Sequence, residues 1–366
     1  MDNTPISGIS ELQAHLQQLA IDPALPPDAK LLDDVELQLT EDNIPPLLPT
    51  LLPPLANILK STTQDPTPLL SLTIKLLSPL SFTQALGVAE PSSLLAALAS
   101  PLAGANLLAL AITSKAAASP SDASILSTLP EVVEALVRCW LASPDVGVGE
   151  RAARVLGDVL ETDCEVPDNR LLDGSRPGRR VPAAEVAKRS LPGHGRLWRL
   201  VLGKGPILRL IHARCSAASL PGNPEPVLSD RQVTISQGRL LRLLPRLSVL
   251  NIRALSQAVV SDVFALPVGA AVEGDVGQGL LQWAALGMVN RSDVLMHLTL
   301  IDFFETFVSI MKVSARSAEA DVLIGKLVKS ATRLDRELEA ALRSLPDRTT
   351  EEEAEPLRAY IADLLD

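Results

Sequence analysis

Residues Gly147 to Ala152 read GVGERA and match the loose form of the dinucleotide-binding fingerprint, G-x-G-x-x-A. In a nucleotide-binding protein these glycines form a tight turn after a strand, which lets the backbone approach a pyrophosphate closely. The preceding residues 129–141 instead have apolar side chains at helical spacing and acidic residues in the first turn. Because the required strand is missing, we interpret the glycines as a helix entry and expect no cofactor. A cofactor loop is the alternative.

Other patterns that support catalysis or metal binding are missing from the sequence. None of the four histidines has the H-x-x-x-H or H-E-x-x-H spacing of a metal site; they are His15, His194, His212 and His297. The chain has no G-x-S-x-G elbow, and Gly203-Lys204-Gly205 lacks the upstream glycine and the Ser or Thr of a phosphate loop. We therefore expect no catalytic, cofactor or metal site. A helical enzyme with an unrecognised site is the alternative from another functional class.

The composition of the 366-residue chain favours an all-α protein. Apolar residues make up 47% of the chain and aromatic residues only 2%, so the apolar content is mostly Leu, Ala and Val. Leu and Ala are strong helix formers, whereas sheets use more aromatic and β-branched residues. The formal net charge of −10 argues against a dedicated nucleic-acid binder. We expect no direct nucleic-acid partner.

The cysteines and the N-terminal residues favour a reducing compartment, and we expect the protein in the cytoplasm and the nucleus. The three cysteines, Cys139, Cys164 and Cys215, are far apart and lack C-x-x-C spacing, which is typical of free thiols in a reducing compartment. The first residues, MDNTPISGIS, have neither the basic nor the apolar region of a signal peptide. The uncharged stretch 91–114 is interrupted at Pro101, Gly104 and Asn106, so it predicts two short helices joined by a turn and no membrane span.

Helix-like apolar runs follow one another along the chain, separated by Pro, Gly, Asp and Ser, and no stretch alternates long enough for a sheet. After one or two short helices within 4–40, these runs cover 47–60, 68–78, 92–100, 104–113, 125–142, 148–161, 196–202, 206–217, 229–248, 277–289, 293–312 and 321–344.

An Asp recurs near the starts of the strongly amphipathic helices, at Asp65, Asp145, Asp230 and Asp293. Such a carboxylate caps free N–H groups and complements the helix dipole. Each of these helices follows another apolar helix, so the chain reads as antiparallel helix pairs that must stack to bury both faces. The pattern predicts a curved HEAT/armadillo-like helical-repeat solenoid.

The composition divides the chain into four segments. They are N-terminal helical repeats at 1–162, a Pro/Gly/Arg-rich flexible loop at 163–195, central helical repeats at 196–312 and charged C-terminal helices at 313–366. The loop carries scattered basic residues, which leaves a nuclear-localisation or nucleic-acid role as an alternative to a plain linker.

The polar sides of three predicted helices are candidate partner-binding surfaces. The second helix of each pair in such solenoids usually lines the concave side, so their outward residues should meet a client. These residues are Arg151, Arg154, Asp158, Arg239, Arg242, Arg246, Asp302, Glu305 and Ser309. The arginines of 229–248 form either a basic ridge for an acidic partner segment or a solvated face with intrahelical ion pairs. The opposite side of 293–312, with three phenylalanines, should pack in the core.

Three stretches, ERAARVLGDVLETDC, LSDRQVTISQGRLLRLLPRLSVLN and VNRSDVLMHLTLIDFFETFVS, resemble one HEAT-like family. Its fungal members are often labelled DNA mismatch repair proteins, and its animal relatives are called proteasome non-ATPase regulatory subunit 5. The resemblance is best over about 125–312 and rests on helical patterns, not on catalytic signatures.

The resemblance implies a non-catalytic assembly chaperone of the proteasome regulatory particle base. A family member binds the C-terminal small domain of an ATPase subunit during base assembly, and other base subunits are possible partners. Two departures weaken the match, because family members are usually longer and the basic 163–195 loop is unusually long. A generic HEAT-type adaptor with another client, including one linked to DNA repair, is the alternative function.

Overall fold

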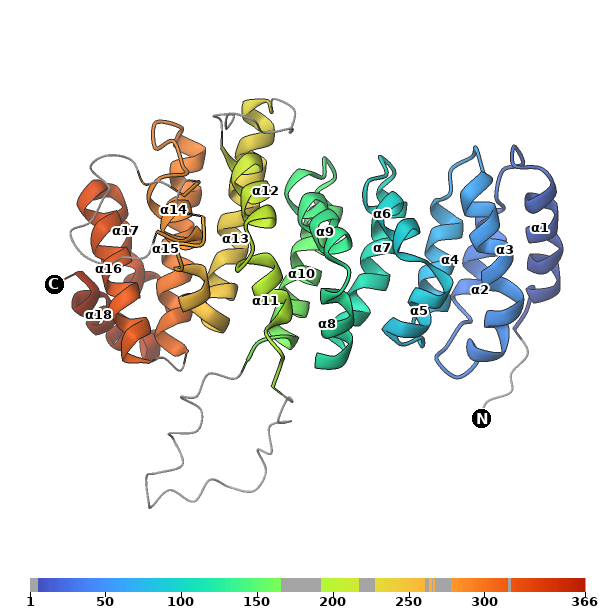
Figure 1. Ribbon diagram of the computed structural model, residues 1–366, viewed down its shortest axis with the longest axis horizontal. Helices are drawn as coiled ribbons and strands as arrows, with labels where there is room; N and C mark the ends of the chain where they lie inside the picture. Colours follow the sequence, from blue (N-terminus) through green and yellow to red (C-terminus); the bar gives the residue numbers. More distant parts are fainter. Residues whose placement is uncertain are drawn as a thin grey trace, which may run out of the picture. The chain divides into compact units, whose positions relative to one another are not determined.

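The computed structural model describes residues 6–165, 192–216, 228–260, 263–264, 266, 278–314 and 317–365, and every regular element among them is a helix (Figure 1). The all-α prediction is therefore confirmed. The chain divides into two compact units, Met1–Cys139 and Trp140–Asp366. The four segments predicted from composition stay a prediction, and most of the 163–195 loop lies outside the described residues.

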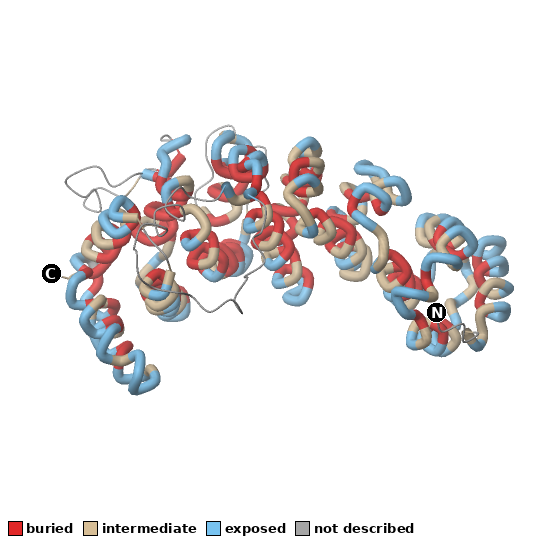
Figure 2. Tube along the Cα trace, turned by 90° about the horizontal axis from the view of Figure 1, so that it is seen from below, coloured by how far each residue is buried: buried red, intermediate tan, exposed pale blue. Residues whose placement is uncertain are grey.

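The first unit is a set of short helices around a leucine-rich core. Helix α4 packs against α2, α3 and α7, and α7 also packs against α5 and α6. The elements are α1 (Ile9–Ile21), α2 (Ala29–Glu36), η1 (Pro45–Leu47), α3 (Leu48–Ser61), α4 (Thr67–Leu77), α5 (Phe82–Val88), α6 (Pro91–Leu98), α7 (Ala103–Ser114), η2 (Lys115–Ala117), α8 (Pro120–Ser127) and most of α9 (Pro130–Ala142). Each helix carries a buried and an exposed side (Figure 2).

The uncharged stretch 91–114 forms two helices joined by a turn, as predicted. Asn106 explains how the turn is held, because its buried Nδ2 donates to the carbonyl oxygens of Ala97, Leu98 and Ser100 at 2.8, 3.2 and 3.1 Å. Ala97 and Leu98 are the last residues of α6 and Ser100 lies just beyond it, where carbonyls lack intrahelical partners. A side chain from the next helix thus caps the end of its predecessor.

In the second unit α13 is the central helix, and it packs against α10, α12, α14 and α15. The elements after the last turn of α9 are α10 (Val146–Thr162), α11 (Arg196–Val201), α12 (Gly205–Cys215), α13 (Asp230–Leu255), α14 (Leu280–Leu286), α15 (Val294–Val313), α16 (Ala318–Leu334), α17 (Arg336–Ser344), η5 (Leu345–Arg348) and α18 (Glu351–Leu365). The predicted apolar stripe of α15 is buried: Met296, Leu300, Phe303, Phe304, Phe307 and Met311.

Helix α15 is also long and apolar enough, by length and hydropathy alone, to cross a membrane. Its phenylalanine side chains pack on one another inside the unit, with the rings of Phe303 and Phe304 5.0 Å apart and those of Phe303 and Phe307 5.7 Å apart. The packing of this stripe accounts for much of the apolar composition of the helix.

The predicted helix starts are largely confirmed. Asp145 accepts from the N–H of Val148, and Asp293 accepts from two N–H groups at the start of α15. Asp65 accepts from the N–H of Thr67, the first residue of α4. The exception is α13, which Ser229 caps through a reciprocal pair of hydrogen bonds with Gln232.

Two predicted helices are each divided in the structure. The run 125–142 is broken because α8 ends at Ser127 and α9 begins at Pro130, a residue that favours the first turn of a helix. The run 321–344 is broken at Asp335, whose extended backbone separates α16 from α17 and whose carboxylate caps α17. Helix α5 was not predicted, although its Ser81–Gln84 capping box is visible in the sequence.

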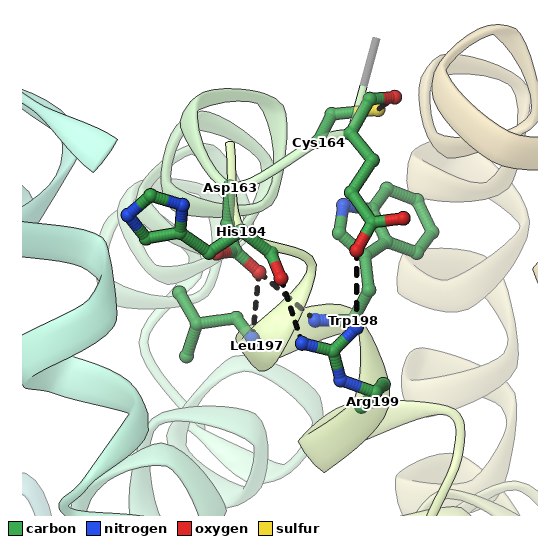
Figure 3. A network of polar contacts seen from close by, with 7 residues as sticks. Asp163, Cys164, His194, Leu197, Trp198 and Arg199 are labelled. Atoms are coloured by element: carbon green, nitrogen blue, oxygen red, sulfur yellow. Dashed lines mark hydrogen bonds and ion pairs between the residues drawn. The ribbon is translucent and has the colours of Figure 1, made fainter. Parts of the chain in front are cut away.

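The two described ends that flank residues 166–191 are tied together (Figure 3). The carboxylate of Asp163 accepts from the N–H groups of Leu197 and Trp198 at the start of α11, at 2.6 and 3.3 Å. The backbone N–H groups of Gly193 and Gly195 donate to the carbonyls of Cys164 and Asp163, at 3.0 and 2.8 Å. Helix α11 is therefore held against the end of α10 independently of the intervening residues.

Asp163 and Asp293 form a matched pair of caps for a stability experiment. Each carboxylate accepts from two N–H groups, but Asp163 is fully buried and Asp293 is partly exposed. We predict that Asp163→Ala lowers the free energy of unfolding by about 2–3 kcal/mol, because two buried donors lose their acceptor. Asp293→Ala should cost about 1 kcal/mol, because water reaches its donors. Chemical denaturation measures both, and equal losses would contradict the role assigned to burial.

Asp335 joins α15 to α17 through a buried carboxylate. Its Oδ1 accepts from the N–H of Leu338 at 3.0 Å, and its Oδ2 lies 2.6 Å from His297 Nε2 and 3.9 Å from Arg291 Nε. Burial raises the pKa of this carboxyl, but the hydrogen bonds from Leu338 and His297 and the attraction of His297 and Arg291 outweigh it. The net pKa lies below the ordinary value of 3.8.

A lowered pKa in the folded state makes the contribution of Asp335 to stability dependent on pH. The ionised carboxylate should stabilise the fold above pH 3.8, and this contribution should be lost as the pH falls from there through the folded-state pKa. We predict that Asp335→Asn reduces the free energy of unfolding at pH 5, and that the difference from the unmodified protein shrinks as the pH falls below 3.8. Urea denaturation across this range measures it. A difference that grows as the pH falls would contradict the predicted direction of the pH dependence.

Candidate partner-binding surface

The nine predicted partner-binding residues all lie on α10, α13 and α15, and α13 packs against both of the others (Figure 1). The predicted residues therefore come from helices that form one contiguous part of the molecule. The structure separates the nine side chains into groups with different surroundings.

Arg239 is buried and does not belong to the surface, which corrects the prediction. Its Nη1 donates to the carbonyls of Trp140, Leu141 and Ser143 at 3.0, 3.2 and 2.8 Å, and its Nη2 donates to that of Asp145 at 3.3 Å. These carbonyls belong to the end of α9 and the turn into α10. The guanidinium thus satisfies backbone acceptors at a helix end, where the last carbonyls lack partners within the helix.

Two glycines of α10 make room for arginines of α13. A Cβ at Gly149 would lie 2.4 Å from Arg239 Cζ, and a Cβ at Gly157 would lie 2.4 Å from Arg246 Nη1. Gly149 is the second glycine of the G-x-G-x-x-A pattern, and α10 follows helix α9 where a dinucleotide site needs a strand. The pattern therefore serves helix packing, and the helix-entry interpretation holds.

The other two arginines of α13 form ion pairs with α10. Arg242 Nη1 lies 2.5 Å from Glu150 Oε1, and Arg246 Nη2 lies 2.7 Å from both Asp158 Oδ1 and Glu161 Oε2. The pairs expected from a solvated face were intrahelical, whereas these connect two helices. Arg242 remains 70% exposed, so its pair restrains the side chain without removing it from the surface.

The first hollow lies between α10 and α13 and has a cavity volume of about 190 Å³. Its lining residues are Trp140, Glu150, Ala153, Arg154, Arg239, Arg242, Leu243 and Arg246. Arg154 is exposed and has no ion pair within the described part of the chain. The buried Nε1–H of Trp140 likewise has no acceptor there. The lining is therefore rich in donors and positive charge.

The second hollow lies between α13 and α15 and has a cavity volume of about 340 Å³. It is lined by Gly238, Leu241, Arg242, Pro245, Leu295, Leu298, Thr299, Asp302, Phe303 and Thr306. Leu295 and Leu298 are 75% and 56% exposed, outside the buried stripe of α15. This hollow is mainly apolar, and Arg242 borders both hollows.

The remaining predicted residues lie outside both hollows. Glu305 is only 16% exposed and forms two hydrogen bonds with Arg348 of η5, and the Ser309 hydroxyl donates to the Glu305 carbonyl. Glu305 thus contacts the C-terminal part of the chain, which corrects its assignment to the surface, whereas Ser309 is half-buried and bonds within its own helix. Asp158 pairs with Arg246, and Arg151 is half-buried beside the first hollow's lining.

Four residues that line the hollows were not predicted from the sequence: Trp140, Gly238, Leu295 and Leu298. The exposed leucines had a visible signal, because they lie off the apolar stripe of their own helix. No signal in the sequence pointed to Trp140 or Gly238, since their role depends on which helices pack together.

The comparisons with known proteins give no relative for this chain. No protein-family model, no curated protein and no solved structure matches it. Within the described residues, no group of His, Cys, Asp and Glu side chains is arranged to hold a metal ion.

Arg239 and Arg242 are one helical turn apart and should respond differently to truncation. We predict that Arg239→Ala lowers the free energy of unfolding by about 2–4 kcal/mol, because it removes charged hydrogen bonds and leaves buried carbonyls without donors. Arg242→Ala should cost about 0–1 kcal/mol, since its ion pair is exposed. Thermal and urea denaturation of both variants measures the difference. Similar small losses in both variants would contradict the structural role of Arg239.

Proposed function

We propose that this chain is a HEAT/armadillo-like helical-repeat protein that acts as a non-catalytic assembly chaperone of the proteasome regulatory particle base. In this proposal the face formed by α10, α13 and α15 binds the C-terminal small domain of an ATPase subunit. Other base subunits are further partners, and the protein works in the cytoplasm and the nucleus. The proposed family rests on the resemblance of three sequence stretches. The choice of surface rests on the packing of the helices that contain them.

The observation that carries the proposal is the position of the three stretches that resemble the family. They cover residues 150–164, 228–251 and 289–309, which correspond to α10, α13 and α15. These stretches are far apart in the sequence, yet α13 packs against both other helices. The resemblance is therefore concentrated in one contiguous set of helices that also carries both hollows.

The chemistry of this face supports binding more than catalysis. Its polar groups are arginines held in ion pairs or on backbone carbonyls, together with the exposed Asp302. Exposed leucines lie beside them. A mixture of apolar area and charges of both signs favours recognition of a protein surface over that of a polyanion.

The mechanism in this proposal is differential binding. A face whose side chains are already held by hydrogen bonds and ion pairs binds the client conformation that matches it and gains little from others. While bound, it covers client surface that would otherwise dock onto another particle. Chaperoning then needs no bond chemistry, and the client is released when a partner with higher affinity competes for the same surface.

The client can be identified by affinity purification of the full-length chain followed by mass spectrometry. We predict that proteasome ATPase subunits dominate the recovered proteins. The double variant Arg154→Glu/Arg242→Glu should recover at least about tenfold less of them, because charge reversal opposes association. Lys326→Glu/Lys329→Glu on α16 makes the same change in net charge away from the hollows and should recover normal amounts.

Recovery of one other client in place of ATPase subunits would favour the generic adaptor, including a repair-linked one. Equal loss in both double variants would show that net charge matters and that this face does not.

A further inference from the structure

The two hollows on the α10, α13 and α15 face are adjacent and share one residue. Arg242 borders both, and it is exposed on the ridge of α13 between them. The hollow towards α10 is lined by basic groups, and the hollow towards α15 is lined mainly by apolar groups. A ligand that spans both hollows would therefore contact basic groups on one side of Arg242 and apolar groups on the other.

The charge of the first hollow favours an acidic group. Arg239, Arg242 and Arg246 already have acceptors or acidic partners, but Arg154 has no ion pair among the described residues. Among the described residues that line it, Glu150 is the only acidic one. The buried Trp140 Nε1–H is a second donor without a partner there. This concentration of arginine side chains stands out in a chain with a formal net charge of −10.

The second hollow favours apolar side chains. Leu295 and Leu298 expose 75% and 56% of their surface beside it, and neighbouring Val294 exposes 70%. Apolar side chains gathered on one part of a surface indicate a contact site, unlike single exposed apolar residues. Asp302 lines this hollow and not the first one, is exposed and has no ion pair within the described residues. It adds a negative charge to the second hollow, whereas Arg154 lines the first.

We propose that this face binds a short linear segment of a protein that carries an Asp or Glu side chain next to apolar side chains. The acidic side chain binds at Arg154 and Arg242 in the first hollow, and the apolar side chains occupy the second hollow against Leu295 and Leu298. A basic residue beyond the apolar ones pairs with Asp302. This inference rests on the proposed function in that both need a protein partner, but it specifies the recognition chemistry and does not depend on the identity of the client.

Gly238 gives a test of the apolar hollow that leaves the fold intact. It lies in α13 on the lining of the second hollow, and a Cβ there would meet no atom within 4 Å. Gly238→Phe therefore fills the hollow from an existing helix, and replacing a helical glycine favours the helix. Gly325 of α16 also has open space around an added Cβ and lines neither hollow. Gly325→Phe is the matched control.

Arg154 gives the corresponding test of the basic hollow. Arg154→Glu reverses a charge on the lining, and Arg196→Glu makes the same change at an exposed arginine of α11, outside both linings. The two variants have the same net charge, so a difference between them reports position on the surface and not overall electrostatics.

The experiment selects a displayed library of random 14-residue peptides on the full-length chain. We expect the selected peptides to combine an Asp or Glu with adjacent apolar residues. Their dissociation constants, measured by fluorescence anisotropy, should rise by at least about tenfold in Gly238→Phe and in Arg154→Glu, as for residues at the centre of an interface. The two control variants should stay within about twofold.

Three results would overturn the inference. They are selection of no peptide, selection of basic or purely apolar peptides, and binding that changes equally in the test and control variants. A single-stranded oligonucleotide that competes with the peptides, and loses affinity in Arg154→Glu but not in Gly238→Phe, would also overturn it, because the apolar hollow would then be irrelevant. Recovery of ATPase subunits by the intact chain is measured separately. A failure of the proposed client can therefore be distinguished from a failure of the proposed peptide recognition.

Discussion

The second unit depends on α13 as a source of side-chain donors for the ends of other helices. Ser236 and Arg239 donate to carbonyls at the end of α9, and Gln237 donates to Cys215 at the end of α12 and to Met288 after α14. All three donors are buried. The last carbonyls of a helix lack partners within it, and leaving them buried and unpaired costs free energy. Because neighbouring residues of one helix satisfy several such ends, the position of α13 fixes where α9, α12 and α14 terminate.

This arrangement also determines which charges are left for binding. The arginines of α13 look equivalent in the sequence, but Arg239 satisfies backbone carbonyls and Arg246 forms two ion pairs with α10. Gly149 and Gly157 allow α10 to approach them closely. Arg242, which is mostly exposed, and Arg154 of α10 remain available to a ligand. The candidate surface is the part of a basic ridge that helix packing does not use.

The helices could be predicted because each one shows its buried side as an apolar stripe in its own sequence. The burial of Arg239 could not, because an amphipathic pattern places every arginine outward. The cause lies on another helix, where Gly149 lacks a side chain. Glu305 was misplaced for the same reason, since its partner Arg348 is 43 residues away in the chain. Local patterns therefore locate the three helices of the candidate surface, and only their packing tells which polar residues are structural.

The same packing makes the candidate surface preorganised. Arg242 lies on a helix whose register is set by the buried donors Ser236, Gln237 and Arg239, so its ridge cannot slide relative to the ends of α9 and α12 without breaking those hydrogen bonds. Its side chain is further restrained by Glu150. A ligand that binds beside it has less conformational entropy to remove than at a free lysine or arginine side chain. Exposed leucines on α15 stay accessible because the buried stripe already satisfies the packing of that helix. Thus the interactions that stabilise the unit also hold its two hollows in a fixed relation, as binding one client conformation in preference to others requires.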